Sequence, residues 1–243
     1  MTSNIGTRYA CAQTGKFALL AEPQGQASGY TSMEPTLLKS AYLDYLRRHG
    51  HAPKTVFAFA DAQGISEGEF YRTYASFAAI EREAWVEFGR EARAQAAQEP
   101  AWQGYGAREK ILAFYYTLLE ILKNNRSFVL LTLKRSQQRK LAVVPKVLDH
   151  FEAEFKEFVE EVLHEGRTTG EVASRPFLQD GYGRIFLRQL QFILLYFVRD
   201  ESAGFERTDA AVEKAVTLSF DLVGRNTFDS ALDFGRFLLQ KHS

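Results

Sequence analysis

The stretch that decides the fold runs from Thr55 to Phe77 and reads T-V-F-A-F-A-D-A-Q-G-I-S-E-G-E-F-Y-R-T-Y-A-S-F. Gly64 separates two short segments whose apolar residues recur at helical spacing. Glycine accepts the positive φ of a sharp turn, and Ser66 is a typical N-cap, with Glu69 three residues later at the capping-box position. The stretch therefore predicts a helix-turn-helix, in which the small Ala60 lets the two helices cross at close range.

The composition bounds what the rest of the chain can be. The chain has 243 residues, 46% of them hydrophobic, enough for one large domain or two small ones. Its 30 basic residues balance its 30 acidic ones, whereas an isolated DNA-binding domain is typically basic. The single cysteine, Cys11, excludes an internal disulfide and favours a reducing, cytoplasmic location. No run approaches the about 18 apolar residues that a transmembrane helix needs.

From Glu34 onward the sequence predicts one helix after another, and no strand pattern competes. Residues 1–32 are rich in Gly, Ser, Thr and Gln without periodicity, so we expect a flexible N-terminal tail. Met33 leaves open the alternative that this tail results from a start site assigned too early. We expect a helix-turn-helix domain over 33–77 and a larger helical domain over 78–243, for ligand binding and dimerisation. Besides the helix that Ser66 caps, the expected helices span 35–49, 53–64, 77–98, 107–124, 126–138, 145–165, 176–199 and 208–241.

The sequence resembles the TetR family of bacterial transcriptional regulators, whose N-terminal pattern is matched by Thr55, Ala60, Gly64, Ile65, Ser66, Tyr71 and Tyr74. The resemblance implies an all-α homodimer, with a three-helix DNA-binding domain and a variable helical domain that holds a ligand. The chain departs from the family at the Ser-Lys pair that usually binds a phosphate, where it has Ser76 and Phe77.

The predicted recognition helix is acidic. Glu67 and Glu69 hold its first exposed positions, and the segment 34–76 has 5 basic and 5 acidic residues. Glutamates at a helix start gain about 0.3–1 kcal/mol from the macrodipole, and a glutamate can also accept a hydrogen bond from cytosine. If the helix binds DNA, we expect phosphate contacts from Lys54, Thr55, Tyr71 and Arg72, and base contacts from Glu67, Gly68 and Glu69. Tyr71 should be partly exposed, because its neighbour Phe70 points inward.

The larger domain is rich in helices that are apolar on more than one face, notably over residues 111–122, 126–133 and 185–198. Such helices form a core, a dimer interface or an apolar pocket. The last two helices should pair a homodimer, as the family's final helices do. The aromatic residues that could line a pocket for an apolar molecule or lipid, with core packing as the alternative for each, are Phe114, Tyr115, Phe128, Phe151, Phe155, Phe158, Phe186, Phe192 and Tyr196.

Two charged blocks stand next to each other in the sequence. Basic residues occur at 134, 135, 139 and 140, and glutamates at 152, 154, 157, 160 and 161. The blocks could form ion pairs across a helical hairpin, which would add little to the stability of the fold. Alternatively, the basic loop could touch an anionic lipid or an acidic partner. None of the five histidines has metal-ligand spacing, and no nucleophile or phosphate-loop motif occurs, so we expect no enzyme, no metal and no cofactor.

Two interpretations follow. In the first, the chain is a TetR-like regulator whose apolar ligand shifts the dimer toward a conformation that does not fit DNA. In the second, the fold is kept without DNA binding. The chain then resembles, in fold alone, the TetR-fold lipid-binding accessory protein of ubiquinone biosynthesis. Its acidic third helix would dock a protein, and its aromatic interior would hold an isoprenoid or acyl chain.

Overall fold

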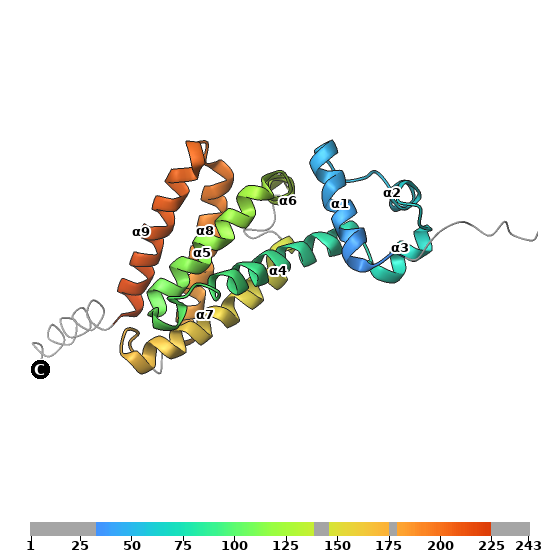
Figure 1. The fold of residues 1–243 in the computed structure, drawn as a ribbon. Helices are drawn as coiled ribbons and strands as arrows, with labels where there is room; N and C mark the ends of the chain where they lie inside the picture. The colour runs from blue at the N-terminus through green and yellow to red at the C-terminus, as the bar shows by residue number, and fades with distance from the viewer. Residues whose placement is uncertain (1–32, 139–145, 175–178, 225–243) are drawn as a thin grey trace, which may run out of the picture.

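The computed structural model describes residues 33–138, 146–174 and 179–224, which fold into α-helices and short 3-10 turns without a strand (Figure 1). Three sequence-based expectations lie outside these ranges. They are the N-terminal tail, the basic residues at 139 and 140, and the end of the final helix. The α-helices are α1 (Pro35–His49), α2 (Val56–Ala62), α3 (Glu67–Thr73), α4 (Phe77–Ala96), α5 (Ala107–Asn124), α6 (Arg126–Gln138), α7 (Asp149–Thr169), α8 (Gln179–Arg199) and α9 (Glu206–Val223).

Helices α1 to α3 form a small unit, here called the head, at one end of the molecule (Figure 1). Leu38, Tyr42 and Leu46 recur at helical spacing on α1 and are at most 1% exposed. They enclose Phe59 of α2 and Phe70 of α3, whose rings lie 6.2 Å apart. The head thus has its own small core of aromatic and aliphatic side chains, as the helical period of its sequence predicts.

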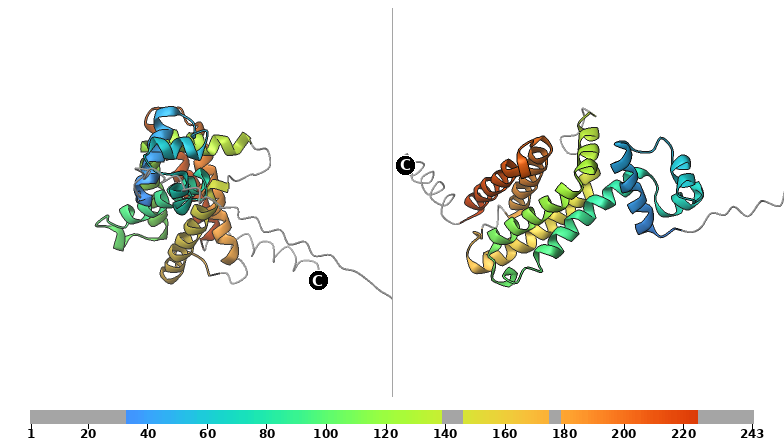
Figure 2. Two further views of the ribbon diagram at one scale, coloured as in Figure 1. Left: turned by 90° about the vertical axis from the view of Figure 1, so that its right-hand side faces the viewer. Right: turned by 45° about the horizontal axis from the view of Figure 1, so that its top comes forward.

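Helix α4 joins the head to the remaining helices, which with α4 are here called the body. It begins beneath the head and runs along the body between α5 and α7 (Figures 1 and 2). Its Trp85 is fully buried, with its ring 6.1 Å from Phe128 of α6 and 5.9 Å from Phe151 of α7. The indole N–H donates to the Thr132 hydroxyl at 3.2 Å. Trp85 therefore fixes α4 against α6 and α7, while α1 of the head contacts both α4 and α6.

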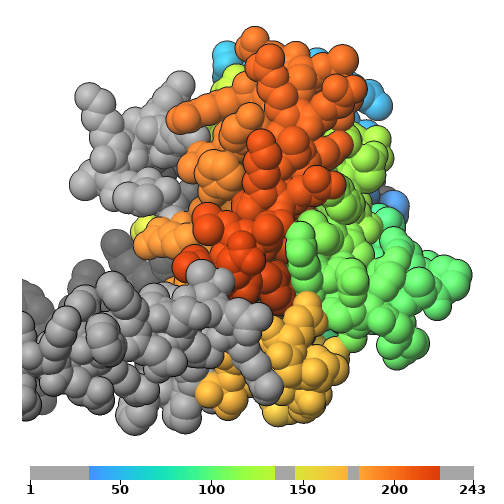
Figure 3. Space-filling model, turned by 90° about the vertical axis from the view of Figure 1, so that its left-hand side faces the viewer, coloured from blue at the N-terminus to red at the C-terminus, as the bar shows by residue number. Residues whose placement is uncertain are grey.

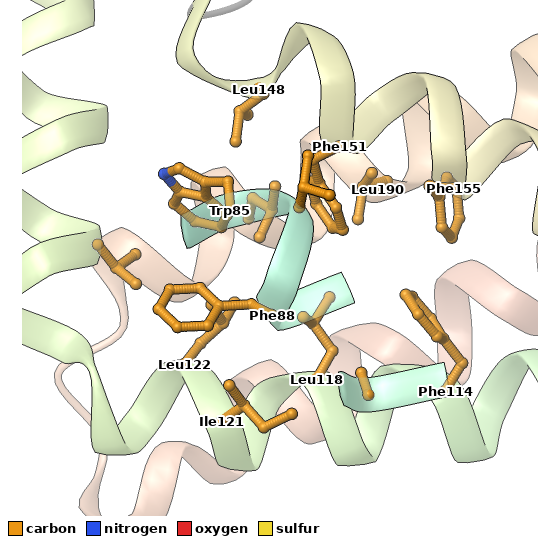
Figure 4. Close-up of a cluster of buried hydrophobic side chains, with 14 of the residues drawn as sticks. Trp85, Phe88, Phe114, Leu118, Ile121, Leu122, Leu148, Phe151, Phe155 and Leu190 are labelled. Atoms are coloured by element: carbon orange, nitrogen blue, oxygen red, sulfur yellow. The ribbon is translucent and has the colours of Figure 1, made fainter. Parts of the chain in front are cut away.

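The body packs α5 against α4, α7 and α9, and α8 against α7 and α9. Figure 4 shows the interior, where Phe151 and Phe155 of α7 face Phe114 and Leu118 of α5. Tyr115 is also buried there, and its hydroxyl donates to the side-chain oxygen of Gln189 at 3.1 Å. The amide of Gln189 in turn donates to the Ser219 hydroxyl at 3.0 Å. This relay links three helices without an unsatisfied buried polar group.

Several helix bounds match the sequence-based expectation, and others do not. Helices α1, α5 and α6 have the expected bounds, and Gly50 and Gly64 take the expected positive φ, 68° and 70°. Helix α2 begins after Thr55 rather than at Pro53, because the Thr55 hydroxyl caps it.

The later helices differ from the expected bounds at their ends. Residues 146–148 form a 3-10 turn, so α7 starts at Asp149, and it continues to Thr169, where Gly170 ends it with a φ of 85°. Helix α4 ends at Ala96, and the expected linker over 102–106 contains the 3-10 turn Trp102–Gly104. Helix α9 ends at Val223.

Within the described ranges no helix combines the length and the hydrophobicity that crossing a bilayer requires.

Candidate functional site

The helix-turn-helix is built from two helix caps and one turn. The Thr55 Oγ1 accepts a hydrogen bond from the Ala58 N–H at 3.1 Å and starts α2. Ile65 is 1% exposed, and its N–H donates to the Ala60 carbonyl across the turn at Gly64. The Ser66 Oγ accepts from the Glu69 N–H at 3.1 Å and starts α3. These local bonds place the second helix against the first, as in a DNA-reading pair.

The seven predicted DNA contacts lie on this pair, and most of them face solvent. Lys54, Thr55, Glu67, Gly68 and Arg72 are exposed, and Tyr71 is 51% exposed while Phe70 is fully buried, as expected from their order in the sequence. The Glu69 carboxylate does not complete a capping box. It accepts a hydrogen bond from Arg72 instead, which partly neutralises the one arginine of the helix.

Phe77, at the position where the resemblance led us to expect a lysine, packs its ring into the head. Its ring stacks on Tyr42 at 4.9 Å with an interplanar angle of 8°, and it lies 5.4 Å from Phe59 and 5.3 Å from Phe70. An offset or edge-to-face ring pair is worth about 0.5–1.5 kcal/mol beyond its buried area. The residue at the start of α4 thus joins head and body, and it is not available to a phosphate.

A buried lysine strengthens the same junction. Lys39 of α1 is 6% exposed, and its ammonium group donates to Glu83 at 2.7 Å and to Glu87, both on α4. The Tyr74 hydroxyl, at the end of α3, donates to the same Glu83 carboxylate at 3.1 Å, and burial with that negative charge raises the pKa of Tyr74. Burial lowers the pKa of Lys39, but the two glutamates outweigh burial and raise it overall. Head and α4 are therefore joined by charge as well as by aromatic packing.

The aromatic residues proposed for a pocket occupy several places. Phe114, Tyr115, Phe155 and Phe158 form one cluster, with the Phe114 ring 5.5 Å from Phe155 and 5.0 Å from Phe158. Phe128 and Phe151 pack on Trp85, and Phe186 packs on Phe220 at 5.4 Å. Phe192 and Tyr196 lie instead on the surface of α8, 49% and 36% exposed. The set thus divides between the interior and an open face.

That open face carries a groove of about 680 Å³ between α8 and α9, the helices drawn in orange and red in Figure 3. Phe192, Tyr196 and the 61% exposed Leu218 stand beside small residues at 210, 211 and 215. Arg188, Arg207 and Lys214 also line it. Large apolar side chains beside a hollow made by alanines suit interdigitation with another helix pair.

A second, smaller cleft of about 290 Å³ opens between α4 and α7, with Phe114 of α5 among its walls. Its apolar lining comes from Gly89 and the rings of Phe114, Phe151, Phe155 and Phe158. Its charged lining comes from Arg90 and Arg93 on α4 and from Glu154 and Glu157 on α7. Part of the predicted aromatic set therefore does border a cavity.

The acidic block on α7 pairs with α4, and Glu165, further along α7, pairs with α5. Arg90 makes two hydrogen bonds to Glu154, at 2.9 and 2.6 Å, Arg93 pairs with Glu161, and Lys110 pairs with Glu165. The basic block mostly lies outside the described side chains, and no pairing between the two blocks occurs among the described residues. The two residues of each arginine pair are 64 and 68 positions apart in the sequence, and no sequence pattern marks such a distant pair. The sequence analysis therefore did not single out Gly89, Arg90 or Arg93. No group of three metal-ligating side chains occurs in the described ranges.

Comparisons with known proteins identify the class. Residues 110–238 match the family model of the tetracycline repressor-like C-terminal domain, which is more than half of the chain. A crystal structure of a candidate TetR-family transcription regulator from Shewanella sp. PV-4 is 12% identical, covering 80% of this chain and 100% of its own, with a TM-score of 0.49. No curated protein sequence matches the chain.

An all-α body with a helix-turn-helix head and a matching C-terminal domain defines the class of protein. The chain belongs to the tetracycline repressor-like family.

Proposed function

We propose that the chain is a homodimeric, DNA-binding transcriptional regulator that responds to a small apolar ligand. The observation that carries the proposal is the capped helix-turn-helix, joined through α4 to a body of the tetracycline repressor-like family. No step of this function requires covalent chemistry, so the chain would not be an enzyme. The cytoplasmic location expected from the single cysteine belongs to the same proposal.

The groove between α8 and α9 supports the dimer. In a two-fold pair each copy presents the same face, so the exposed Phe192, Tyr196 and Leu218 of one copy can enter the hollow of the other. Fully burying an exposed side chain of this size is worth about 1.5–3 kcal/mol, and because these three are already about half-buried, each would add about 1 kcal/mol. A symmetric pair buries six such side chains. We expect their summed free energy of burial to offset a moderate free-energy cost of lost translational and rotational freedom, and the dimer to be stable.

The exposed face of α2 and α3 supports DNA contact with a small electrostatic footprint. Lys54 is exposed and makes no ion pair among the described residues, whereas Arg72 is shared with Glu69. Hydroxyl groups of Thr55 and Tyr71 can add phosphate contacts without charge. A dimer would set the two recognition helices about 34–36 Å apart, and Glu67 and Gly68 would stand nearest the bases.

The junction between the head and α4 supports regulation. Lys39, Phe77 and Tyr74 bind the head to α4, so a tilt of α4 in the body changes the separation of the two heads. A ligand that binds one tilt better than the other would shift the population toward it. Such a ligand therefore needs a site that touches α4.

Selection of random duplexes at low ionic strength tests DNA binding. We expect the full chain to enrich a palindromic motif with half-sites one helical turn apart. Replacing Glu67 and Glu69 with lysine should raise general affinity and steepen its salt dependence, since each new phosphate contact adds about 0.9 to the slope on B-DNA. Selectivity should fall at the same time.

A lack of enrichment, with and without apolar ligands, would reject the regulator. It would leave a family member that docks a protein through its acidic third helix and holds a lipid.

A further inference from the structure

The end of α1 and the turn that follows it gather the basic side chains of the head. Five exposed residues there can carry a positive charge, and we call them the basic corner: Arg47, Arg48, His49, His51 and Lys54. In Figure 1 this turn runs from the end of α1 to the start of α2. The corner therefore stands beside the first helix of the helix-turn-helix.

The rest of the head offers no unpaired basic side chain within the described residues. Lys39 and Arg72 are both paired with glutamates. Within the corner, Arg47 is paired with the one aspartate of α1, whereas Arg48 and Lys54 make no ion pair or hydrogen bond among the described residues. The balanced charge of the head thus conceals a separation, with a positive corner and an acidic start of α3.

Two imidazoles of the corner share one tyrosine. The ring of Tyr45 lies 4.1 Å from the ring of His49 and 6.2 Å from that of His51, and the two imidazoles are 6.1 Å apart. Gly50, with a φ of 68°, ends α1 and turns the chain so that His51 comes back to this tyrosine. The Nδ1 of His51 lies 2.9 Å from the carbonyl oxygen of Ala52. Because a carbonyl can only accept, Nδ1 carries the hydrogen, and Nε2 is left for another partner.

The position of the corner suits a phosphate backbone. When the second helix of a helix-turn-helix enters the major groove, the first helix crosses the backbone. Lys54 directly precedes Thr55, which caps the start of that first helix. The corner can therefore supply the cations that the starts of α3 and α4 do not, where Glu67 and Phe77 stand.

We propose that the basic corner binds the phosphate backbone of duplex DNA beside the start of α2, and that its two histidines strengthen this contact as the pH falls. The inference rests on the proposed function, because it assigns a regulated backbone contact to the same DNA-binding head.

The direction of the pH dependence follows from the charge of imidazole. Histidine is the side chain whose charge ordinarily changes between about pH 5 and 8. A proton gained by His49 or His51 adds one positive charge beside Arg48 and Lys54, and phosphates attract the charged form more strongly. Lower pH therefore favours the complex with DNA, and DNA favours uptake of protons by the corner.

The helices packed around the corner do not offset this charge. On α1 the only carboxylate, Asp44, is paired with Arg47. Helix α2 carries one carboxylate, Asp61, in its last turn. The glutamates of α4 that reach α1 bond to side chains no closer to the corner than Tyr42, two turns before the end of α1. Helix α6, which contacts α1, has no acidic residue and adds the exposed Lys134.

Titration of a duplex of random sequence with the full chain, followed by fluorescence anisotropy, tests the corner. The slope of log K against log salt should be steeper at about pH 5.5 than at about pH 8, by up to about 0.9 for each histidine of a head. Each such contact gains about eightfold in affinity for every tenfold dilution of salt. His49→Gln combined with His51→Gln should remove most of this difference between the two pH values.

His150→Gln combined with His164→Gln is the matched control, because it removes two exposed histidines of α7 in the body and should leave the difference intact. Arg48→Gln should lower the slope by about 0.9 for each head at both pH values. Cations in the last turn of α1 also interact with the dipole of that helix. Thermal unfolding of each variant measures this effect on stability separately from DNA affinity.

The proposal is overturned if the duplex does not bind at either pH. It is also overturned if the histidine variant of the corner keeps the wild-type difference, or if the control loses it equally. A random duplex needs no operator, so the two proposals can fail separately. Binding that depends on the corner, without an enriched motif, would reject the regulator and keep the corner. An enriched motif, with corner variants that bind like wild type, would reject the corner and keep the regulator.

Discussion

Asp200, in the turn between α8 and α9, is a single carboxylate on which the packing of both helices depends. One oxygen accepts from the N–H and hydroxyl of Ser202, at 2.8 and 2.6 Å. The other accepts from the N–H and hydroxyl of Thr208, in the first turn of α9, also at 2.8 and 2.6 Å. Arg126 closes the turn from the other side, with its guanidinium 4.6 Å from the Phe197 ring and 4.5 Å from the Phe205 ring.

Replacing Asp200 with alanine should lower the free energy of unfolding by about 2–3 kcal/mol. Thr208 is fully buried, so its N–H and hydroxyl lose their partner, at about 1–3 kcal/mol for each unsatisfied group. Ser202 is only half-buried, and water can replace the carboxylate there. Because Asp200 lies just beneath a surface turn, water can also reach part of the space that it leaves, and we take the lower part of the range.

The same contacts set the dependence on pH. Burial alone raises the pKa of Asp200, but the hydrogen bonds from Ser202 and Thr208 outweigh it and hold the pKa well below its ordinary value. A carboxyl group with a depressed pKa stabilises the fold above its unfolded pKa of about 3.9, and this stabilisation is lost as the pH falls through the folded value. The stability difference between wild type and Asp200→Ala should therefore narrow below about pH 4.

Urea unfolding at one protein concentration, at pH 7 and at steps down to about pH 3, measures both effects. Glu201→Ala is the control, because the neighbouring Glu201 is exposed and makes no hydrogen bond within the described residues. A loss below about 1 kcal/mol at pH 7, or an equal loss in the control, would refute the reasoning.

Two further predictions concern the junction and the dimer. Lys39→Met should cost about 1–2 kcal/mol, less than a fully buried ion pair, because Glu83 and Glu87 are 43% and 46% exposed and can hydrate. Limited proteolysis should then cut the head before the body, and unchanged proteolysis would count against the junction. Phe192→Glu combined with Leu218→Glu changes four side chains per dimer, and at about 1 kcal/mol each should weaken the dimer about 1,000-fold. Light scattering at micromolar concentration should show a monomer, and a persistent dimer would place the interface elsewhere.

The local structure of the head could be predicted from its sequence. A positive φ at Gly64 and the N-caps at Ser66 and Thr55 depend on residues within four positions of each other, so the order of residue types suffices. The same holds for the buried face of α1 and for the contrast between Phe70 and Tyr71. The start of α2 was misplaced because Pro53 and Thr55 are both good starting residues, and only the hydrogen bond to Ala58 decides between them.

Which side chains far apart in the sequence contact one another was decided by the tertiary structure alone. The sequence shows Phe77 only as a missing lysine, whereas the fold makes it an aromatic joint against Tyr42. Composition predicted an aromatic interior, but the packing of α4, α5, α7, α8 and α9 divides the aromatic residues among a core, a cleft and an open face. The glutamates of α7 look like a solvated stripe until α4 brings Arg90 and Arg93 beside them. Helical period determines which residues share a face, but which helix covers that face depends on the sum of many weak contacts across the whole chain.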